Sequence, residues 1–480
     1  MAFLTRRQSP FHVAEPADER KPDLLLWSLS LMILIAVWRI QDLFPVLGIL
    51  ELNLVVTAVT IGLFAIDRDP LRHLSKVKSP ILFCLLAVLT LAILGVPMSL
   101  WPRRSATIVV RDFLQNLLLM VLVAAIVRDM RDLARIATVI LAGAWMFSLF
   151  VHLNFEAGPT GRLNHLVYYD SNDLALVLVC TIPFAIFFLV RQGRRYQLFA
   201  LASLALFVAT LAKTGSRGGF LGFAAVLVYI LVGYRAIRRR VRMVAIAGVM
   251  GLLTILAGEA YWNAMRTLRD PQQDYNWAGR SAEGRMEIWR RGLRYIAADP
   301  FLGVGMGNFP LAEGMLSEES RTRAERGVGF KWSVAHNVFL PVAVELGLIA
   351  FAFFVATLIA AFRALHRLRS VPLLHDPQTQ RRVALACTLT ASLVGFLVSG
   401  LFISAAFFSY LYVLLGLTMG FVKIHRHDRL PSLEWSGWHP RVAARHMAAV
   451  SASLHRPSIF SRSPRSAAVN RRKRNPQQRG

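Results

Sequence analysis

Long apolar runs, separated by short polar stretches, dominate the hydrophobic pattern of the chain. Each run is close to the length that a helix needs to cross a hydrocarbon core of about 30 Å. Backbone amides in hydrocarbon must be paired locally, and continuous apolar runs lack the alternation of a membrane barrel. The pattern therefore predicts an all-α polytopic membrane helix bundle with about 12 transmembrane helices, at 24–40, 45–66, 80–98, 112–127, 135–153, 173–190, 196–213, 219–234, 243–260, 336–362, 383–400 and 402–423.

One long polar segment interrupts this pattern between the ninth and tenth runs. The predicted organisation is an N-terminal segment 1–23, a membrane bundle 24–260, a polar loop 261–335, a second part of the bundle 336–423 and a basic tail 424–480. Within the loop, apolar residues recur at helical spacing from 283 to 299, and Asp299-Pro300 ends the run. We expect an amphipathic helix there, which lies either at the membrane surface or against the bundle.

The composition supports a membrane protein rather than a soluble one. Of the 480 residues, 55% are hydrophobic and 17% are charged, and the mean hydropathy is +0.48. One soluble core cannot bury that much apolar surface. The three cysteines lie inside apolar runs without metal-ligand spacing, so they indicate neither a disulfide framework nor a zinc site. We expect no cofactor.

The basic residues predict how the bundle is oriented. The net charge is +27, and one alternating set of short connections holds 24 Lys and Arg against 6 in the opposite set. Positive loops face the cytoplasm, so both termini are expected inside, with a retained first span, and the 261–335 loop outside. The tail is predicted to be disordered and cytoplasmic, either simply solvated or lying on anionic membrane lipid. Attraction to anionic membrane lipid explains the net positive charge of the chain better than binding to nucleic acid does.

Three polar residues at predicted helix ends are candidates for catalysis: Arg217, Arg285 and His336. Arg217 follows Lys213-Thr214-Gly215-Ser216 in a tight turn, where a cation at membrane depth is costly unless it meets an anion. A snorkelling arginine and a hydrogen-bonded histidine at the start of a helix are the simpler alternatives. A histidine whose pKa is near neutrality can nevertheless take a proton from a hydroxyl, while arginines hold an anionic leaving group.

Further polar positions are candidates for substrate binding. Arg162 and Asn172 lie in the loop before the sixth run, and a cap on that helix is the simpler alternative for Asn172. Gly305 and Gly307, in Gly303-Val-Gly-Met-Gly307, follow no strand and so predict a compact turn near a ligand rather than a nucleotide site. No cluster with metal spacing stands out, and we predict no metal.

These motifs resemble those of the bacterial O-antigen ligase and polymerase family. The resemblance rests on Thr214-Gly-Ser-Arg-Gly-Gly219, Gly284-Arg-x-x-Ile-Trp289, the glycine run to Phe309, and His336-Asn337 followed by Glu345-Leu-Gly347. It implies a metal-independent, inverting glycosyltransferase of the bacterial inner membrane, facing the periplasm. Arg217 and Arg285 would hold the diphosphate of an undecaprenyl-diphosphate-linked glycan donor, and His336 would activate the acceptor hydroxyl. By the same resemblance, Asn337 is expected to bind substrate.

The acceptor and one other class of function stay open. The acceptor is a lipid, a growing glycan or a protein, the last corresponding to a protein O-oligosaccharyltransferase. A transporter or flippase of lipid-linked sugar also fits twelve spans with both termini inside. The spans contain few ionisable residues and no symmetric pair of broken helices, which favours surface chemistry.

Overall fold

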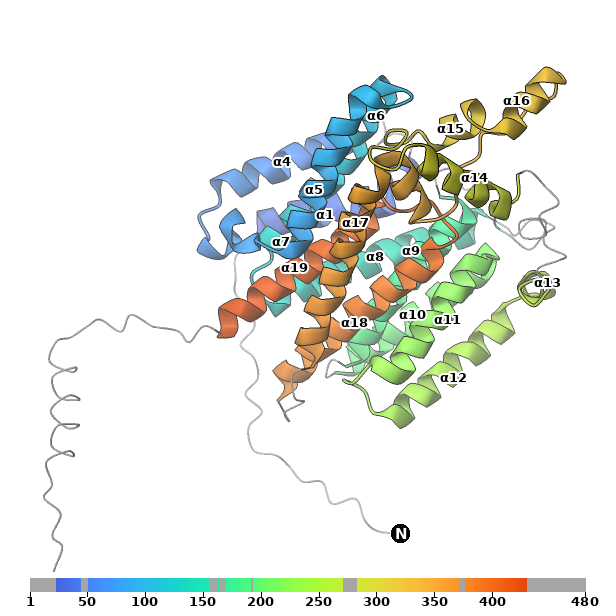
Figure 1. Ribbon diagram of the computed structural model, residues 1–480. Coiled ribbons are helices and arrows are strands. Elements are labelled where there is room, and N and C mark those ends of the chain that lie inside the picture. Colours follow the sequence, from blue (N-terminus) through green and yellow to red (C-terminus); the bar gives the residue numbers. More distant parts are fainter. Residues whose placement is uncertain are drawn as a thin grey trace, which may run out of the picture. The chain divides into compact units, whose positions relative to one another are not determined.

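The computed structural model describes residues 23–44, 51–155, 163, 169–190, 193–270, 283–370 and 376–429. By its internal contacts the chain divides into Met1–His427, which contains the bundle, and Asp428–Gly480. The described part of the first unit is almost entirely helical, which confirms the predicted all-α class (Figure 1). Its α-helices are α1 (Leu24–Trp38), α2 (Ile40–Leu43), α4 (Leu52–Ile66), α5 (Pro80–Gly95), α6 (Pro102–Ile108), α7 (Gln115–Ile126), α8 (Met130–Asn154), α9 (Ser171–Leu189), α10 (Arg194–Thr214), α11 (Arg217–Gly233), α12 (Arg239–Leu256), α13 (Glu259–Arg266), α14 (Arg285–Ala298), α15 (Phe309–Met315), α16 (Glu318–Glu325), α17 (Leu340–Arg369), α18 (Pro377–Gly400) and α19 (Ser409–Arg429).

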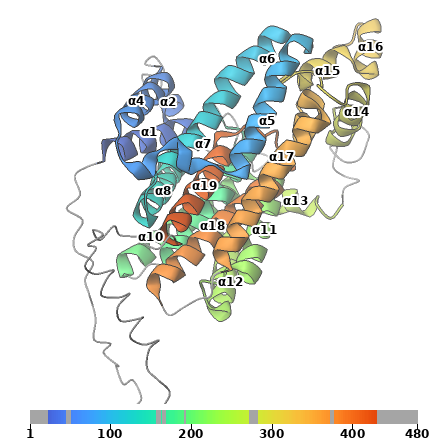
Figure 2. The same ribbon diagram turned by 60° about the vertical axis from the view of Figure 1, so that its left-hand side comes forward.

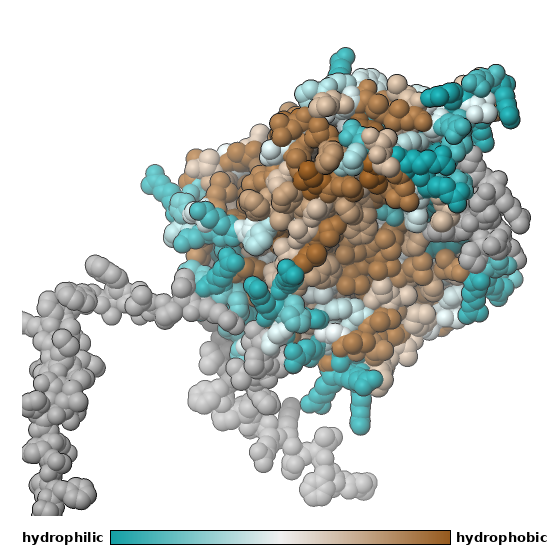
Figure 3. Space-filling view, viewed as in Figure 1, coloured by the Kyte–Doolittle hydropathy of each residue, from teal (hydrophilic) through white to brown (hydrophobic). Residues whose placement is uncertain are grey.

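Within the described ranges, seven helices are long and apolar enough to cross a membrane. The count is eight if α12 and α13, which meet at 111°, form one broken span, and α1, α4 and α11 are shorter apolar helices. A multi-pass membrane bundle is therefore confirmed, whereas the count of twelve stays a prediction. On the face shown in Figure 3, apolar side chains cover the middle and hydrophilic ones gather towards the edges.

Helices α9 and α18 form the centre of the bundle. In each of them 83% of the most apolar stretch is buried, and α9 packs against α10, α11 and α18. Helices α4 and α12 are peripheral, since α12 buries only Leu253 among its side chains. Their exposed apolar residues, such as Leu54 and Val244, have the character of lipid-facing positions.

Several predicted boundaries are wrong. The residues 99–111, expected as a loop, are helical from Pro102, and a π-helical turn, η4 (Val109–Leu114), joins α6 to α7. The helix expected from residue 402 begins at Ser409. The helix expected from His336 begins at Leu340, because the Asn337 side chain accepts hydrogen bonds from the backbone N–H groups of Phe339 and Leu340, at 2.7 and 3.0 Å, and Pro341 follows.

The polar segment after α12 forms a small helical layer at one end of the bundle. Figures 1 and 2 both place α14, α15 and α16 at this end, which is called the site end from here on. A small apolar cluster, separate from the main core of the bundle, holds the layer together. It is formed by Ile288, Tyr295, Val304, Phe309, Ala312, Ala335 and Val344. The amphipathic helix predicted at 283–299 is α14, and it packs on α17, where Gly292 lies directly against Leu340.

At the opposite end, ion pairs tie several connections to the start of α1. Arg128 pairs with Asp23 at 2.6 Å and with Asp132 at 3.1 Å, and Arg72 pairs with Asp67 at 2.5 Å. Arg72 also pairs with Asp23, so both arginines bind the residue that caps the N-terminus of α1. These partly buried pairs fix the helix ends far from the candidate site.

Candidate active site

Arg217 is placed by a two-residue turn between α10 and α11. Gly215 has a left-handed backbone (φ 59°), which glycine adopts without steric cost, and the Ser216 hydroxyl oxygen caps α11 by accepting from the N–H of Gly219 at 3.0 Å. The half-buried Arg217 is the first residue of α11, and its Nη1 donates to the Thr267 hydroxyl at 2.8 Å. Ser216 also donates to Oδ1 of Asn172 at 2.8 Å. The turn therefore brings Arg217 next to the N-terminus of α9.

Arg285 reaches the same place from the loop layer. It is the first residue of α14 and half-buried, and its guanidinium carbon lies 6.0 Å from the ring centre of Phe402. Gly218 also packs against Phe402, since a Cβ added to Gly218 would lie 3.0 Å from the Phe402 Cβ. Phe402 thus contacts both Arg285 and Gly218, the residue that follows Arg217 at the start of α11.

His336 lies in an irregular segment before α17, and hydrogen bonds hold the chain on both sides of it. Trp289 Nε1 donates to the carbonyl oxygen of Ala335 at 2.8 Å, and the N–H of Val338 donates to the carbonyl of Gly400 at 2.7 Å. His336 itself has a left-handed backbone, with φ 47°, which is uncommon for a residue with a Cβ. Neighbours from α14 and α18 therefore hold the imidazole in a conformation that its own chain segment would seldom adopt.

The surroundings of His336 favour its neutral form. Burial lowers the pKa of the imidazole below the ordinary value of 6.5, and the positive charges of Arg285 and Lys331 lower it further. Asp170 raises that pKa, but the net change is downward. A neutral imidazole at neutral pH is ready to accept a proton.

The structure brings together most of the residues predicted for the site. Arg217, Arg285, His336 and Asn172 all lie at the site end, and Asp170 connects them, since it caps α9 and acts electrostatically on His336. The alternative that Asn172 caps α9 is wrong, because Asp170 is the cap; the Asn172 side chain instead accepts a hydrogen bond from Ser216. Arg162 lies outside the described residues. The roles of these residues in substrate binding and catalysis stay predictions.

Asn337 is engaged in holding the chain. Besides capping α17, its Nδ2 donates to the carbonyl oxygen of Leu401 at 3.2 Å. This contact joins the His336 segment to the connection that carries Phe402. Asn337 therefore positions the two sides of the site relative to each other, and a direct contact with substrate stays a prediction.

The glycine run packs against α5–α6 and α17. Gly303, Gly305 and Gly307 all have positive φ, and the buried Glu345 carboxylate accepts hydrogen bonds from the N–H groups of Gly307, at 2.8 Å, and Phe309, at 3.0 Å. An added Cβ on Gly305 would lie 2.0 Å from the Cβ of Ser99. This close approach already explains glycine at that position, and contact of Gly305 or Gly307 with a ligand stays a prediction.

Three positioning elements were not singled out as site residues from the sequence. Trp289 and Phe402 contact the site directly, as described above, and the third is the buried pair of Arg291 and Glu313. Arg291 Nε lies 3.0 and 3.1 Å from the two carboxylate oxygens, and both side chains are at most 1% exposed. The pair locks α14 onto α15. An acidic residue between apolar neighbours at 309–315 was the available signal for Glu313.

The chemistry of this arrangement suits an anionic leaving group and a hydroxyl. Two guanidiniums can donate paired hydrogen bonds to phosphate oxygens and stay charged at any relevant pH. The neutral imidazole supplies a proton acceptor beside them. In the part of the chain that the structure describes, no three His, Cys, Asp or Glu side chains are grouped as a metal site requires.

Comparison with known proteins identifies the family of this region. Residues 202–355 match the family model described as O-antigen ligase, so the resemblance noted from the motifs is confirmed for this segment, which contains Arg217, Arg285 and His336. A protein of Haemophilus influenzae, described as uncharacterized, is 20% identical over 205 residues, 41% of this chain. The match spans about half of that relative, 51% of its length.

Proposed function

We propose, from the O-antigen ligase segment at residues 202–355, that this protein is a membrane glycosyltransferase that moves a glycan from an undecaprenyl-diphosphate carrier to an acceptor hydroxyl. The observation that carries the proposal is the convergence of Arg217, Arg285 and His336 at one end of the bundle, although 119 positions separate the first from the last. These three side chains supply what the transfer needs: charge for the leaving group and a base for the acceptor.

The reaction is a single displacement. The acceptor hydroxyl oxygen attacks the anomeric carbon of the glycan, the bond from that carbon to the diphosphate oxygen breaks, and the electron pair leaves with the diphosphate. His336 takes the hydroxyl proton as the new glycosidic bond forms. Attack opposite the leaving group inverts the anomeric centre, as the family resemblance implies.

Arg217 and Arg285 act on the diphosphate. A sugar joined through a diphosphate already has a good leaving group, so stabilisation of the developing negative charge and one base suffice. The guanidinium of Arg217 is held by Thr267, and that of Arg285 lies over Phe402, so both are ordered before substrate arrives. Such preorganised charge costs little reorganisation during the reaction.

The orientation of the bundle in the membrane decides how the lipid-linked donor reaches the site. We place the site end at the periplasmic face of the bacterial inner membrane, because the short connections at the other end carry most of the basic residues. The twelve-span topology belongs to this proposal. A polyprenyl chain would then lie along apolar helix surfaces while its diphosphate reaches the arginines at the helix ends.

Two alternatives concern the acceptor and the class of protein. A protein O-oligosaccharyltransferase would use the same three residues with a Ser or Thr hydroxyl, but the described soluble part is one small helical layer. A flippase would need a polar path through the bundle and would form no glycosidic bond. The fixed arrangement of arginines and histidine at one surface supports transfer over transport.

A reconstitution experiment separates these classes. The purified protein is placed in vesicles with a lipid-diphosphate glycan donor and the lipid or glycan acceptors of the same cell envelope, without ATP or an ion gradient. We expect a glycosylated acceptor and free undecaprenyl diphosphate in equal amounts. Movement of the donor between leaflets without any product would overturn the proposal.

A further inference from the structure

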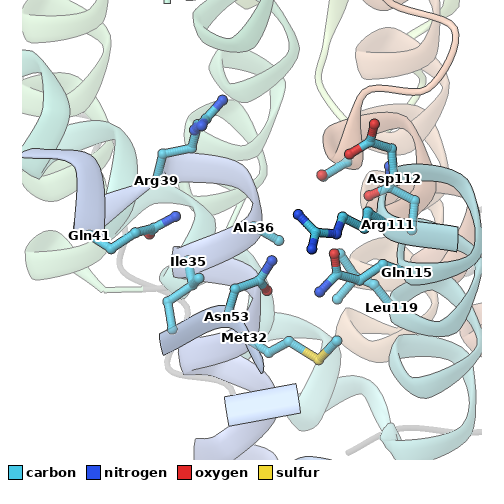
Figure 4. Close-up of a pocket in the computed structure, with 12 residues that line it drawn as sticks. Met32, Ile35, Ala36, Arg39, Gln41, Asn53, Arg111, Asp112, Gln115 and Leu119 are labelled. Atoms are coloured by element: carbon cyan, nitrogen blue, oxygen red, sulfur yellow. The ribbon is translucent and has the colours of Figure 1, made fainter. Parts of the chain in front are cut away.

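A polar pocket of about 190 Å³ lies between helices of the bundle, and none of the three site residues lines it. It is lined by α1, α2, α4, the π-helical turn η4, α7 and the first residue of α19, through Met32, Ile35, Ala36, Arg39, Gln41, Asn53, Arg111, Asp112, Gln115, Asn116, Leu119 and Ser409 (Figure 4). The volume suits a single monosaccharide unit rather than a whole oligosaccharide.

The lining is more polar than its place among apolar helices requires. Arg111, Asn53 and Gln115 point toward one another across the cavity (Figure 4). Oε1 of Gln41 is buried and accepts no hydrogen bond from any described residue. Polar groups at membrane depth cost free energy unless they meet a partner, so this set favours a polar occupant.

Arg111, which lines the cavity, lies in the π-helical turn η4. Val109–Leu114 adds a residue to the turn between α6 and α7, and such turns are frequent at functional sites. Within the described chain, Arg111 forms no ion pair or side-chain hydrogen bond, whereas Arg39 pairs with Asp42. Arg111 is therefore the cation available to an occupant, with the Asp112 carboxylate beside it in the lining.

Two contacts link the cavity to the site end. Asn116 donates to the carbonyl oxygen of Phe407 at 2.7 Å, in the same connection that carries Phe402 under Arg285. Tyr169 donates to the carbonyl of Val37 near the end of α1, and it directly precedes Asp170, which acts on His336. Two hydrogen bonds therefore connect helices that line the cavity with segments that carry residues of the candidate active site.

We propose that this cavity binds a negatively charged saccharide unit of the acceptor, an inference that rests on the proposed glycosyltransferase function. The side-chain amides of Asn53, Gln115 and Gln41 can both donate to and accept from sugar hydroxyls. The guanidinium of Arg111 matches a phosphate or carboxylate substituent. The cavity then selects the acceptor, while Arg217 and Arg285 hold the donor.

Binding of a small probe tests the proposal without any turnover. The protein in phosphatidylcholine nanodiscs is titrated with glucose 6-phosphate, and binding is followed by equilibrium dialysis. Glucose and glycerol 1-phosphate serve as probes that lack the charge or the sugar ring. We expect glucose 6-phosphate to bind at least tenfold more tightly than either of them.

Substitutions of lining residues test whether glucose 6-phosphate binds in this cavity. Arg111→Gln and Gln115→Leu should each weaken binding of glucose 6-phosphate about tenfold or more, whereas Arg103→Gln, on the exposed face of α6, should leave it unchanged. Arg217→Gln should also retain binding, because that residue belongs to the donor site. Equal binding by wild type and Arg111→Gln, equal binding of glycerol 1-phosphate, or loss only in Arg217→Gln would overturn the proposal.

A kinetic measurement separates this proposal from the proposed function. If wild type transfers glycan, Arg111→Gln should raise the KM for a charged acceptor about tenfold and leave the KM for the donor unchanged. An unchanged acceptor KM would overturn the acceptor role while leaving the transferase intact. Absence of transfer in wild type, together with Arg111-dependent sugar phosphate binding, would instead overturn the proposed function alone.

Discussion

The indole of Trp289 donates a 2.8 Å hydrogen bond to the carbonyl oxygen of Ala335, the residue directly before His336. Trp289 lies one helical turn after Arg285 on α14. One side chain therefore couples the position of the proposed base to the helix that carries one of the proposed diphosphate ligands. The relative placement of Arg285 and His336 depends on this bond.

Replacing Trp289 by Phe should disturb that placement while keeping most of the packing. We expect kcat to fall on the order of tenfold or more, because small misplacements of reacting groups are costly, with little change in the donor KM. The measurement is steady-state transfer kinetics. Trp27→Phe is the matched control, since Trp27 is 69% exposed on α1. An equal loss in both variants, or none in Trp289→Phe, would contradict this coupling.

The pH dependence of transfer should report the charges around His336. The rate should fall on the acid side as the imidazole gains its proton, with a midpoint below the ordinary histidine pKa of 6.5. Arg285→Gln removes a charge that lowers the His336 pKa, so the midpoint should move to higher pH. Asp170→Asn removes a charge that raises it, so the midpoint should move to lower pH.

The two shifts are measured as pH profiles of kcat/KM, each normalised to its own maximum. Arg290→Gln serves as the control, because this arginine is 62% exposed and pairs with Glu287. Shifts of the same sign in Arg285→Gln and Asp170→Asn would show that the acid limb does not belong to His336.

The buried pair of Arg291 and Glu313 should matter for stability. Removing one partner leaves an uncompensated buried charge, so Arg291→Met should cost about 3–5 kcal/mol. The double variant Arg291→Met/Glu313→Leu should recover a large part of that loss. Arg290→Met, at an exposed pair, should change stability by less than about 1 kcal/mol. Thermal unfolding in detergent measures all three, and a double variant no better than the single one would contradict the argument.

Cysteine labelling tests the proposed orientation. In a variant without the three native cysteines, Thr322→Cys on α16 should react with an impermeant reagent applied from the periplasmic side. Arg238→Cys, at the start of α12 and exposed, should react only after the membrane is opened. The reverse pattern would place His336 towards the cytoplasm and remove the proposed access to a periplasmic acceptor.

The sequence predicted the helical class and the convergence of the main site residues because membrane helices and helix-end motifs depend on local patterns. Arg217 follows a glycine turn, and His336-Asn337 precedes an apolar run, and both features are visible in the sequence. Phe402 under Arg285 and the bond from Trp289 to Ala335 are contacts between distant segments, which no local pattern encodes. The π-helical turn likewise depends on packing, whereas the sequence pattern predicts a loop at Arg111.

The most direct test of the central claim is a single-turnover measurement of glycan transfer from a lipid-diphosphate donor already bound to the protein. On addition of acceptor, His336→Ala should slow the release of undecaprenyl diphosphate by about 100-fold or more, since general base catalysis contributes about 10²–10⁴-fold. Arg217→Ala should slow it as well, and the purified wild type should need no ATP. Release by His336→Ala and Arg217→Ala within twofold of the wild-type rate would contradict the account.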